Sequence, residues 1–493
     1  MTQARNVLKK VFGLEEFRPG QAEVIASVLE GHDTVAIMPT GAGKSLCYQL
    51  PALLLHGTTL VVSPLISLMK DQTDKLAERG LAVASVNSTL TSAEENEHLD
   101  RISSDRTEFV LTTPERLVTE DFAGMLRRTA VDFVVVDEAH CIAQWGHDFR
   151  PAYLELRDAI AGLTTADRRR PPILALTATA PEQVLTSIRA ELGLVTPRII
   201  NTGVYRPNLQ YSVLRTVNEQ QKREQLIRWL SEAAGSGIVY ASTVKQVDAL
   251  YEPLTGAAGG VARYHGRMSA AQRREQQERF MSGEARGMVA TNAFGMGIDK
   301  PDVRFVIHYN MPGSLEAYYQ ESGRAGRDGE PARCALFYQL EDRRTQLYFL
   351  GGRYPKQSEV QAVYECVARL GPDGQAVRVD ELKTTLAGVV APARIRVVLS
   401  LLKDAGVARS TRTAAVRVLN PGLSAAQVAA VADAYRERQA GDREKLEQMM
   451  RYGQSAGCRW VQLLEYFGEQ LDERCGTCDN CRHPLEQQVA RPA

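Results

Sequence analysis

Short apolar runs alternate with longer amphipathic stretches in the first part of the chain. Between residues 12 and 201, the runs expected to be strands are 34–38, 59–63, 109–112, 133–136 and 173–176. Helical patterns lie between them. Strands that alternate with helices are typical of a parallel sheet with crossover helices on its faces. The pattern therefore predicts an α/β lobe over residues 1–203.

A second set of short apolar runs follows, at 237–240, 261–264, 287–290, 305–308 and 334–337. These runs again alternate with helical patterns, which predicts a second parallel-sheet lobe over 204–345. The segment 196–207 lies between the two sets, and we expect it to be the hinge between the lobes.

The pattern changes after residue 345. Ile395, Val398, Leu399 and Leu402 have the i, i+3, i+4, i+7 spacing of a helix that faces a core. A shorter helix is expected at 380–386, and the apolar–polar–apolar pattern of 406–419 predicts a β-hairpin. Two helices followed by a hairpin indicate a winged-helix-like insert over 346–440. A cysteine-containing module over 441–484 and a disordered tail over 485–493 complete the expected organisation.

The composition is ordinary for a globular protein, with 44% apolar and 24% charged residues. Basic and acidic residues number 59 each, so net charge indicates no partner and any nucleic-acid surface must be local. The N-terminus has no signal-peptide pattern, and no apolar run is long enough for a membrane helix. We therefore expect a cytoplasmic protein without a membrane partner, nucleoid-associated if its source is bacterial.

Residues 39–45, PTGAGKS, follow the first expected strand and form a candidate phosphate loop. Glycines let the backbone aim its N–H groups at phosphate oxygens, and the following helix would turn its positive end toward the same anion. The lysine would reach the β- and γ-phosphates, and the serine would bind Mg²⁺. The strict pattern has glycine where this chain has Met38, and the alternative is a glycine-rich turn with a surface lysine. The loop's candidate ATP-binding residues are Thr40, Gly41, Gly43, Lys44 and Ser45.

The fourth expected strand ends in two carboxylates, in FVVVDEAH at 133–140. Ligands bind at the carboxyl edge of such sheets. Asp137 would hold Mg²⁺ through water, together with Ser45, and Glu138 would orient and deprotonate the water that attacks ATP. The alternative is an acidic pair that caps a helix, which the nearby phosphate loop disfavours.

The second lobe supplies two arginines in YQESGRAGRDG at 319–329. Arg324 and Arg327 are three positions apart, so they could share a helix face. If the lobes close over ATP, the arginines would stabilise the transferred phosphoryl group, an effect of about 10³–10⁵ in rate. The alternative is a solvated basic helix. Gln320 belongs to the same segment and is a candidate nucleotide contact.

Four of the eight cysteines lie in the last tenth of the chain: Cys458, Cys475, Cys478 and Cys481. In a reducing compartment, such a cluster favours a metal over disulfides. Four thiolates suit tetrahedral Zn²⁺ without an open position, which would make the site structural. An iron–sulfur cluster is one alternative, and His483 in place of one cysteine is another.

These motifs resemble those of the RecQ DNA helicases in the second helicase superfamily. The motifs in family order are FRPGQ (17–21), PTGAGKS, SPLISLMKDQ (63–72), TTPERL (112–117), DEAH, LTATA (176–180), YHGRMS (264–269) and YQESGRAGRDG. The most specific match, CIAQWGHDFRPAY at 141–153, is similar to the family's aromatic-rich loop. The resemblance covers about residues 5–345 and the cysteine module. It implies an α/β fold with two tandem RecA-like lobes, and an ATP-dependent 3′-to-5′ DNA helicase of repair, recombination or replication.

The resemblance also implies roles for individual residues. Gln21, with Arg18 beside it, would read the adenine. Thr177 and Thr179 would couple hydrolysis to DNA. The residues expected near the DNA backbone are Ser63, Thr113, Ser242 and Thr291. For each of these hydroxyls the alternative is a helix cap or a turn.

The aromatic-rich loop also has a physical interpretation of its own. Trp145 and Phe149 could stack on unpaired bases, at roughly 1–3 kcal/mol each, and Arg150 could hold a phosphate. Because the loop follows DEAH, it could report bound DNA to the ATP site. The alternative is that both aromatics belong to the core.

The order of the C-terminal parts departs from the common family layout. Most members have the zinc module directly after the second lobe and a winged helix after it, whereas here the winged-helix-like segment comes first. Its hairpin carries Arg409, Arg412 and Arg417 without an aromatic tip. Contact of this hairpin with duplex DNA therefore stays open, and a role in packing alone is the alternative.

By the same resemblance, the expected partners are single-stranded and forked DNA, and the cofactors are ATP, Mg²⁺ and Zn²⁺. A single-strand-binding protein or a topoisomerase is a candidate protein partner, and the expected state is a monomer. Two other functions stay open: an RNA helicase, and an ATP-switched DNA-binding or strand-annealing protein that does not unwind. The relative activation of ATP hydrolysis by DNA and RNA, and a forked-duplex unwinding assay, would separate them.

Overall fold

The computed structural model describes residues 1–55, 57–104, 107–142, 151–257, 260–295, 300–410 and 415–484. The chain divides into two units. The first comprises Met1–Gln339 and Tyr452–Ala493, and the second comprises Leu340–Arg451. The second unit is therefore an insertion, because the chain leaves the first unit after Gln339 and returns to it at Tyr452.

In the described part of the chain, the first sheet has seven strands, all parallel, in the order β3-β4-β2-β5-β6-β1-β7. They are β1 (Thr34–Ile37), β2 (Thr58–Val62), β3 (Val83–Val86), β4 (Phe109–Thr112), β5 (Val131–Val136), β6 (Ile173–Thr177) and β7 (Arg198–Asn201). The five expected strands correspond to β1, β2, β4, β5 and β6. The sequence reasoning missed β3 and β7. Since β7 lies inside the expected hinge 196–207 and pairs with β1, the first part of that hinge is a strand.

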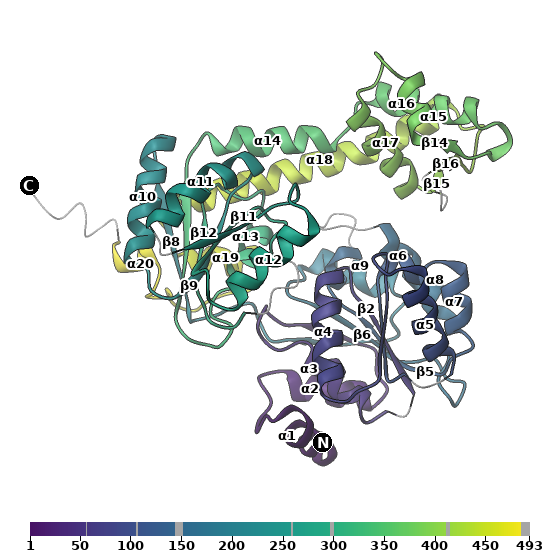
Figure 1. Ribbon diagram of the computed structural model, residues 1–493, viewed down its shortest axis with the longest axis horizontal. Helices are drawn as coiled ribbons and strands as arrows, with labels where there is room; N and C mark the ends of the chain where they lie inside the picture. The colour runs from purple at the N-terminus through teal and green to yellow at the C-terminus, as the bar shows by residue number, and fades with distance from the viewer. Residues whose placement is uncertain are drawn as a thin grey trace, which may run out of the picture. The chain divides into compact units, whose positions relative to one another are not determined.

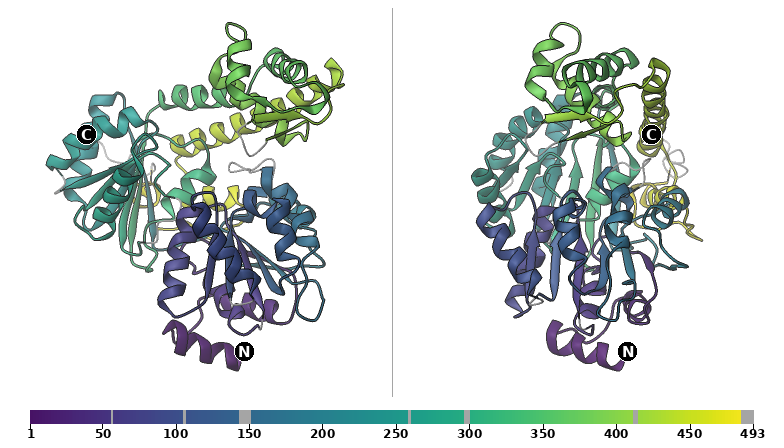
Figure 2. Two further views of the ribbon diagram at one scale, coloured as in Figure 1. Left: turned by 45° about the vertical axis from the view of Figure 1, so that its right-hand side comes forward. Right: turned by 90° about the vertical axis from the view of Figure 1, so that its right-hand side faces the viewer.

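Helices cover both faces of this sheet (Figures 1 and 2). One face packs against α5 (Ser92–Ser103), α7 (Glu120–Leu126), α8 (Leu156–Ala161) and α9 (Glu182–Glu191), the other against α2 (Gln21–Leu29), α3 (Leu46–Ala52) and α4 (Ile66–Glu78). Alternate residues of a strand point to opposite faces. Val134 and Val136 accordingly belong to one core, and Phe133 and Val135 to the other. The remaining helices of this lobe are α1 (Thr2–Phe12), α6 (Pro114–Leu117) and the 3₁₀ turns Ala139–Ile142 and Pro151–Glu155.

The second sheet is also parallel, with the strand order β10-β11-β9-β12-β13-β8. Its strands are β8 (Leu209–Arg215), β9 (Ser236–Tyr240), β10 (Val261–Tyr264), β11 (Gly287–Ala290), β12 (Val303–His308) and β13 (Ala332–Tyr338). Its helices are α10 (Glu219–Glu232), α11 (Val244–Ala257), α12 (Ala270–Met281) and α13 (Leu315–Ser322). The sequence reasoning missed β8, an edge strand whose burial is incomplete. The two parallel sheets confirm the predicted tandem α/β fold.

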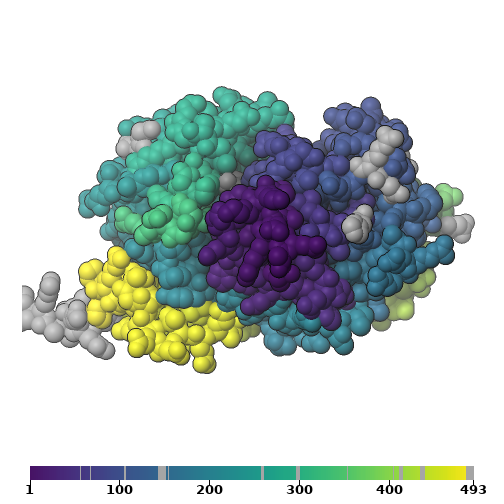
Figure 3. All heavy atoms as spheres, turned by 90° about the horizontal axis from the view of Figure 1, so that it is seen from below, coloured from purple at the N-terminus to yellow at the C-terminus, as the bar shows by residue number. Residues whose placement is uncertain are grey.

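The cysteine module packs on the edge strand β8 of the second sheet. It comprises α19 (Arg459–Tyr466) and α20 (Asp479–Arg482). Trp460 is fully buried, its ring lies edge-on to Tyr211 with centroids 5.1 Å apart, and its Nε1 donates to the carbonyl of Leu209 at 3.0 Å. Figure 3 shows this last described segment, in yellow, on the surface beside the teal second lobe. The module is thus anchored to that lobe by a buried aromatic side chain.

The second unit has the element order of a winged helix. After α14 (Asp342–Arg353) come α15 (Gln357–Leu370), a 3₁₀ turn (Pro372–Gly374), β14 (Val377–Arg378), α16 (Val379–Thr385), α17 (Pro392–Asp404), β15 (Ala408–Ser410) and β16 (Ala415–Val418). The strands form an antiparallel sheet in the order β14-β16-β15. The predicted apolar stripe is confirmed, because Ile395, Val398, Leu399 and Leu402 are all buried in this unit's core.

The long helix α18 (Ala425–Gln454) follows the hairpin and leads back to the first unit. It runs without a break through residue 440, so the boundary expected between 440 and 441 falls inside a helix. In the hairpin, Arg409 and Arg417 are paired across the two strands. Arg412 lies outside the described residues.

Among the described residues, no helix combines the length and the apolar character that a membrane crossing requires. The aromatic-loop residues Trp145, Phe149 and Arg150 lie outside the described residues, as does the tail expected over 485–493. Their roles therefore stay predictions from the sequence.

Candidate nucleotide site and cysteine cluster

The candidate ATP and DNA residues of the first lobe gather at one edge of its sheet. The strands β4, β2, β5, β6 and β1 are neighbours in the sheet, and the carboxyl ends of parallel strands meet at the same edge. The residues that follow these strands are Thr113, Ser63, Asp137, Thr179 and the loop 39–45. Residues that are distant in sequence are thus brought together.

The phosphate loop has the backbone that its glycines allow. Gly41 and Gly43 have φ angles of +86° and +78°, a left-handed conformation that glycine adopts without strain. A Cβ atom at position 43 would lie 2.6 Å from Nε2 of Gln21, so a larger residue there would displace the Gln21 side chain. Met38, which departs from the strict pattern, directly follows β1 and is fully buried, with its N–H donating to the Thr177 carbonyl at 3.0 Å.

The ammonium group of Lys44 is the strongest sign of an anionic ligand. Its Nζ is shielded from solvent and, among the described residues, has no hydrogen-bond partner. A buried ammonium group that donates no hydrogen bond is unfavourable, although its charge attracts the carboxylate of Asp137. A phosphate group held by the loop would supply the missing hydrogen-bond acceptors. The loop and the ammonium group of Lys44 therefore fit a nucleoside triphosphate, with Lys44 at its phosphates.

The two carboxylates lie directly after β5. The Oγ of Ser63 donates to Oδ2 of Asp137 at 3.3 Å, and the hydroxyl of Tyr153 donates to the Asp137 carbonyl at 2.9 Å. Burial raises the pKa of Asp137, and repulsion from Glu138 adds to the rise. A buried, hydrogen-bonded carboxylate of this kind fits a Mg²⁺ ligand, because a cation would stabilise its ionised form.

The backbone at Glu138 is strained. Its φ of +48° lies in the left-handed region, which is unusual for a residue other than glycine and costs about 1–3 kcal/mol. Strain of this kind is common at active sites, because the surrounding structure holds one side chain in a functional position. The strained position coincides with the carboxylate expected to activate water.

His140 connects Glu138 to the segment after β6. Its Nδ1 lies 3.3 Å from Oε2 of Glu138 and 3.1 Å from Oγ1 of Thr177. In turn, Oγ1 of Thr177 donates to the Thr179 carbonyl at 2.8 Å. The two threonines expected to couple hydrolysis with DNA are thus linked to Glu138, the carboxylate expected to activate water. The sequence reasoning assigned no role to His140 or Tyr153, although both belong to its motifs.

Gln21 and Arg18 contact the phosphate loop in this structure. Nε2 of Gln21 donates to the carbonyls of Ala42 at 3.0 Å and Gly43 at 3.1 Å, and Nη1 of Arg18 donates to the carbonyl of Gly41 at 2.5 Å. Both side chains therefore lie beside the expected nucleotide. Their contact with adenine stays a prediction.

The expectation that Arg324 and Arg327 share a helix face is wrong. Helix α13 ends at Ser322, and both arginines lie in the following loop, where Gly326 has a φ of +55°. Gln320 remains on the helix. Nη1 of Arg324 donates to the carbonyl of Gly295 in its own lobe.

Arg327 lies beside the phosphate loop. A Cβ atom at position 41 would be 3.1 Å from Cγ of Arg327. The second lobe therefore brings one of its two candidate arginines against the loop that carries Lys44.

The hydroxyl residues expected near DNA make contacts within their own lobes. Oγ1 of Thr113 accepts from the N–H of Arg116 at 3.3 Å and caps α6. The N–H of Ser242 donates to Oδ1 of Asn310 at 3.0 Å, and that of Thr291 donates to the carbonyl of Tyr264 at 3.1 Å. DNA contact by these residues stays a prediction.

Arg206, which no sequence motif indicated, lies in the connector 202–208 between the lobes. Its side chain is buried, and its guanidinium donates to carbonyls of the phosphate loop and of the arginine loop 323–327. A single buried arginine in a connector leaves no periodic signal, so the sequence offered no indication of it.

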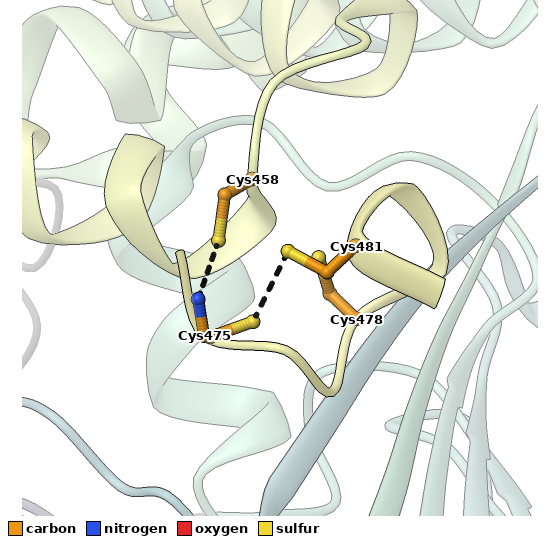
Figure 4. Close-up of side chains that lie close together, drawn as sticks. All are labelled: Cys458, Cys475, Cys478 and Cys481. Carbon is orange, nitrogen blue, oxygen red and sulfur yellow. Dashed lines mark hydrogen bonds between the residues drawn. The ribbon is translucent and has the colours of Figure 1, made fainter. Parts of the chain in front are cut away.

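The four C-terminal cysteines form one cluster (Figure 4). Their Sγ atoms all lie within 4.8 Å of one another, and those of Cys475 and Cys481 are 3.9 Å apart. Tetrahedral Zn²⁺ with Zn–S bonds of about 2.3 Å needs sulfur atoms about 3.8 Å apart. The geometry therefore fits a closed zinc site. His483 is not part of the cluster found among the described residues.

Backbone N–H groups point at the sulfur atoms. The N–H of Cys475 donates to Sγ of Cys458, and that of Arg459 donates to Sγ of Cys478, both at 3.4 Å. The hydrogen bond from Cys478 lowers the pKa of Cys475 to about 4. Cys458 directly precedes α19. The two backbone N–H groups favour the thiolate form, which binds zinc, whereas the hydrogen bond with Cys475 raises the pKa of Cys478 and burial raises that of Cys481.

Three family models match the chain. DEAD/DEAH box helicase covers residues 18–188, helicase conserved C-terminal domain covers 221–329, and RecQ zinc-binding covers 424–482. The third match includes α18 and the four cysteines. The segment 330–423, which contains the winged-helix-like part, lies between the second and third matches.

Curated relatives match over most of the chain. ATP-dependent DNA helicase RecQ of Bacillus subtilis is 36% identical over 97% of this chain and 67% of its own length. The protein of the same name from Synechocystis is 34% identical over 96% of this chain and 97% of its own length. The chain spans only 52% and 54% of the relatives from Pasteurella multocida and Haemophilus influenzae.

A solved structure of Mycobacterium smegmatis helicase Lhr bound to single-stranded DNA and AMP-PNP has a similar fold. It aligns with a TM-score of 0.56 and 22% identity, over 100% of this chain and 66% of that one. At this identity the likeness concerns the fold alone.

Proposed function

Since the chain belongs to the RecQ family of ATP-dependent DNA helicases, we propose that it hydrolyses ATP between its two α/β lobes to unwind DNA. The observation that carries the proposal is the buried ammonium group of Lys44, which has no hydrogen-bond partner among the described residues. It lies in a loop that follows β1, at the sheet edge that also carries Asp137 and Glu138. A triphosphate is the ligand that this arrangement suits.

Each residue around the phosphate loop has a separate role in ATP hydrolysis. Lys44 binds the phosphates, and Glu138 orients and deprotonates the attacking water. Mg²⁺, which Ser45 and Asp137 would hold, supplies positive charge at the phosphate oxygens. Arg324 and Arg327 of the second lobe stabilise the charge that develops during transfer. The position of Arg327 beside Gly41 supports this division.

The DNA-binding residues are proposed from the sequence motifs. Trp145 and Phe149 stack on unpaired bases, and Arg150 holds a phosphate beside them. The link from Glu138 through His140 to Thr177 gives DNA on the first lobe a physical connection to the hydrolysis site. Movement from 3′ to 5′ on single-stranded DNA rests on the family resemblance.

Substrate, partners and location follow from the same proposal. A forked duplex with a single-stranded tail is the substrate that a translocating motor unwinds. A single-strand-binding protein would protect the separated strands, and a topoisomerase would act on the products. The proposed state is a monomer, working where the chromosome lies, in the cytoplasm and on the nucleoid if the source is bacterial.

A forked-duplex unwinding assay with 3′-tailed, 5′-tailed and blunt substrates tests the function. We expect ATP-dependent unwinding of the 3′-tailed substrate, ATP hydrolysis that DNA stimulates more than RNA, and loss of both activities in Lys44→Ala. Arg79→Ala, a change at an exposed arginine of the same lobe, serves as the control.

Each outcome identifies a function. ATP-dependent DNA binding without strand separation would identify an ATP-switched binding or annealing protein. Stronger stimulation by RNA would identify an RNA helicase. Normal ATP turnover in Lys44→Ala would contradict the assigned phosphate site.

A further inference from the structure

Arg206 holds the loop that carries the two candidate catalytic arginines. Its Nη1 donates to the Gly323 carbonyl at 2.7 Å, and its Nη2 donates to the carbonyls of Ala325 at 2.8 Å and Gly326 at 2.5 Å. These carbonyls flank Arg324 and directly precede Arg327. The planar guanidinium has five N–H donors in a fixed arrangement, so one side chain fixes the backbone of the whole arginine loop.

The same guanidinium also reaches the phosphate loop. Nη1 of Arg206 donates to the Thr40 carbonyl at 3.2 Å, and Oγ1 of Thr40 donates to the Gly323 carbonyl at 3.2 Å. The approach at this point is close, because a Cβ atom at position 323 would lie 2.2 Å from Oγ1 of Thr40. Arg206 is therefore bonded to the two loops that must meet at the phosphates.

The connector that carries Arg206 is itself held on both sides. Carboxylate oxygens of Glu469 accept from the Val204 N–H at 3.0 and 3.1 Å, and the hydroxyl of Tyr319 on α13 donates to the Val204 carbonyl at 2.7 Å. Nδ2 of Asn208 donates to the Gly326 carbonyl at 2.8 Å. A connector anchored at these points keeps the Arg206 side chain in one place.

We propose that Arg206 is a positioning residue for ATP hydrolysis, which fixes the arginine loop against the phosphate loop so that Arg324 and Arg327 meet the transferred phosphoryl group. The inference rests on the proposed function. It differs from that function because, among the described residues, Arg206 donates only to backbone carbonyls, so it acts through the loops that it holds rather than on ATP itself.

The test measures ground-state and transition-state binding separately in the full chain. Arg206→Ala should lower kcat for DNA-stimulated ATP hydrolysis by about 10²-fold, because small misplacement of catalytic groups has effects of this size. Affinity for ADP–aluminium fluoride with Mg²⁺, which mimics the transition state, should fall by a similar factor. KM for ATP and affinity for ADP should change by less than about 3-fold, because the arginines act mainly in the transition state.

Arg286→Ala is the matched control. Arg286 lies in the same lobe and, within the part of the chain that the structure describes, also donates only to backbone carbonyls, those of Leu230, Ala233 and Gly235. Its loss should lower thermal stability without a selective loss of ADP–aluminium fluoride binding. The proposal would be overturned if Arg206→Ala lost affinity for ADP and for ADP–aluminium fluoride by the same factor. It would also be overturned if Arg206→Ala and Arg286→Ala lost affinity for ADP–aluminium fluoride alike.

Two further variants keep the test decisive. In the double variant Arg206→Ala with Arg327→Ala, kcat should fall by no more than about 3-fold below Arg327→Ala alone, because residues that act through one another are not additive. A fall in kcat equal to the product of the two single effects would overturn the proposal.

If Arg206→Ala does not fold, Arg206→Lys replaces it. This variant should have a lower kcat and an unchanged affinity for ADP. An unchanged kcat in Arg206→Lys would contradict the need for a guanidinium.

The proposed function fails independently of this inference. It fails if the unmodified protein shows no DNA-stimulated ATP hydrolysis and no unwinding. The inference alone fails if the unmodified protein is active and the selective effect of Arg206→Ala is missing.

Discussion

The nucleotide site and the cysteine cluster differ in how completely their polar groups are satisfied. At the nucleotide site, Nζ of Lys44 is buried without a hydrogen-bond partner among the described residues, and Glu138 has a strained backbone. In the cysteine cluster, the sulfur atoms lie at zinc-binding distances and accept backbone N–H groups. A site that exchanges its ligand in every cycle needs groups that only the ligand satisfies, whereas a structural site is closed.

The two sites also differ in how they are assembled. The nucleotide site combines loops after five neighbouring strands with a loop of the other lobe. The cysteine cluster is contained in the segment 458–481 and anchored by Trp460. We therefore expect changes in the cluster to affect stability most, and changes at the sheet edge to affect turnover most.

The largest effect should come from loss of the metal. Cys478→Ser should release zinc and unfold the module around Trp460, because binding contributes about 10–16 kcal/mol to folding in zinc-finger peptides. Metal analysis and tryptophan fluorescence would measure this. Cys366→Ser, at a buried cysteine outside the cluster, should retain zinc. If Cys478→Ser still bound one zinc per chain, the cluster would not be the structural metal site that the comparison with the nucleotide site assumes.

A smaller effect, confined to turnover, is expected at the strained carboxylate. Glu138→Gln should lower kcat for ATP by about 10²–10⁴-fold, because it removes a general base. Affinity for ATP and thermal stability should stay near those of the unmodified protein, as measured by equilibrium binding and thermal melting. Glu182→Gln, in the first turn of α9, is the control. Unchanged turnover in Glu138→Gln would show that another group activates the water.

The smallest effect should distinguish two roles of Ser63. If its hydroxyl orients Asp137, Ser63→Ala should raise the Mg²⁺ concentration for half-maximal hydrolysis by about 2–10-fold, since one hydrogen bond contributes about 0.5–1.5 kcal/mol. Ser27→Ala removes a different buried hydroxyl, bonded to Thr34 at 2.7 Å, and should leave this Mg²⁺ dependence unchanged. Weaker DNA binding with unchanged Mg²⁺ dependence would instead support the contact expected from the family resemblance.

Short-range signals in the sequence predicted much of the fold and of both sites. The ten lobe strands that were predicted have apolar runs between polar segments, and the phosphate loop, the DEAH segment and the cysteines have fixed local spacing. Of the missed strands, β3, β7 and β14 are short, and β7 and β8 are partly exposed. Their partners are distant in sequence, so no local pattern indicated them.

Sequence alone determined which chemical groups the protein carries: a glycine-rich loop with Lys44, a pair of carboxylates, two arginines and four cysteines. Only the tertiary structure decided that the arginines lie in a loop after α13 and that Arg206 bonds to that loop and to the phosphate loop. The physical reason is that spacing along the chain controls local backbone geometry, whereas a buried guanidinium between distant carbonyls depends on how separate elements pack.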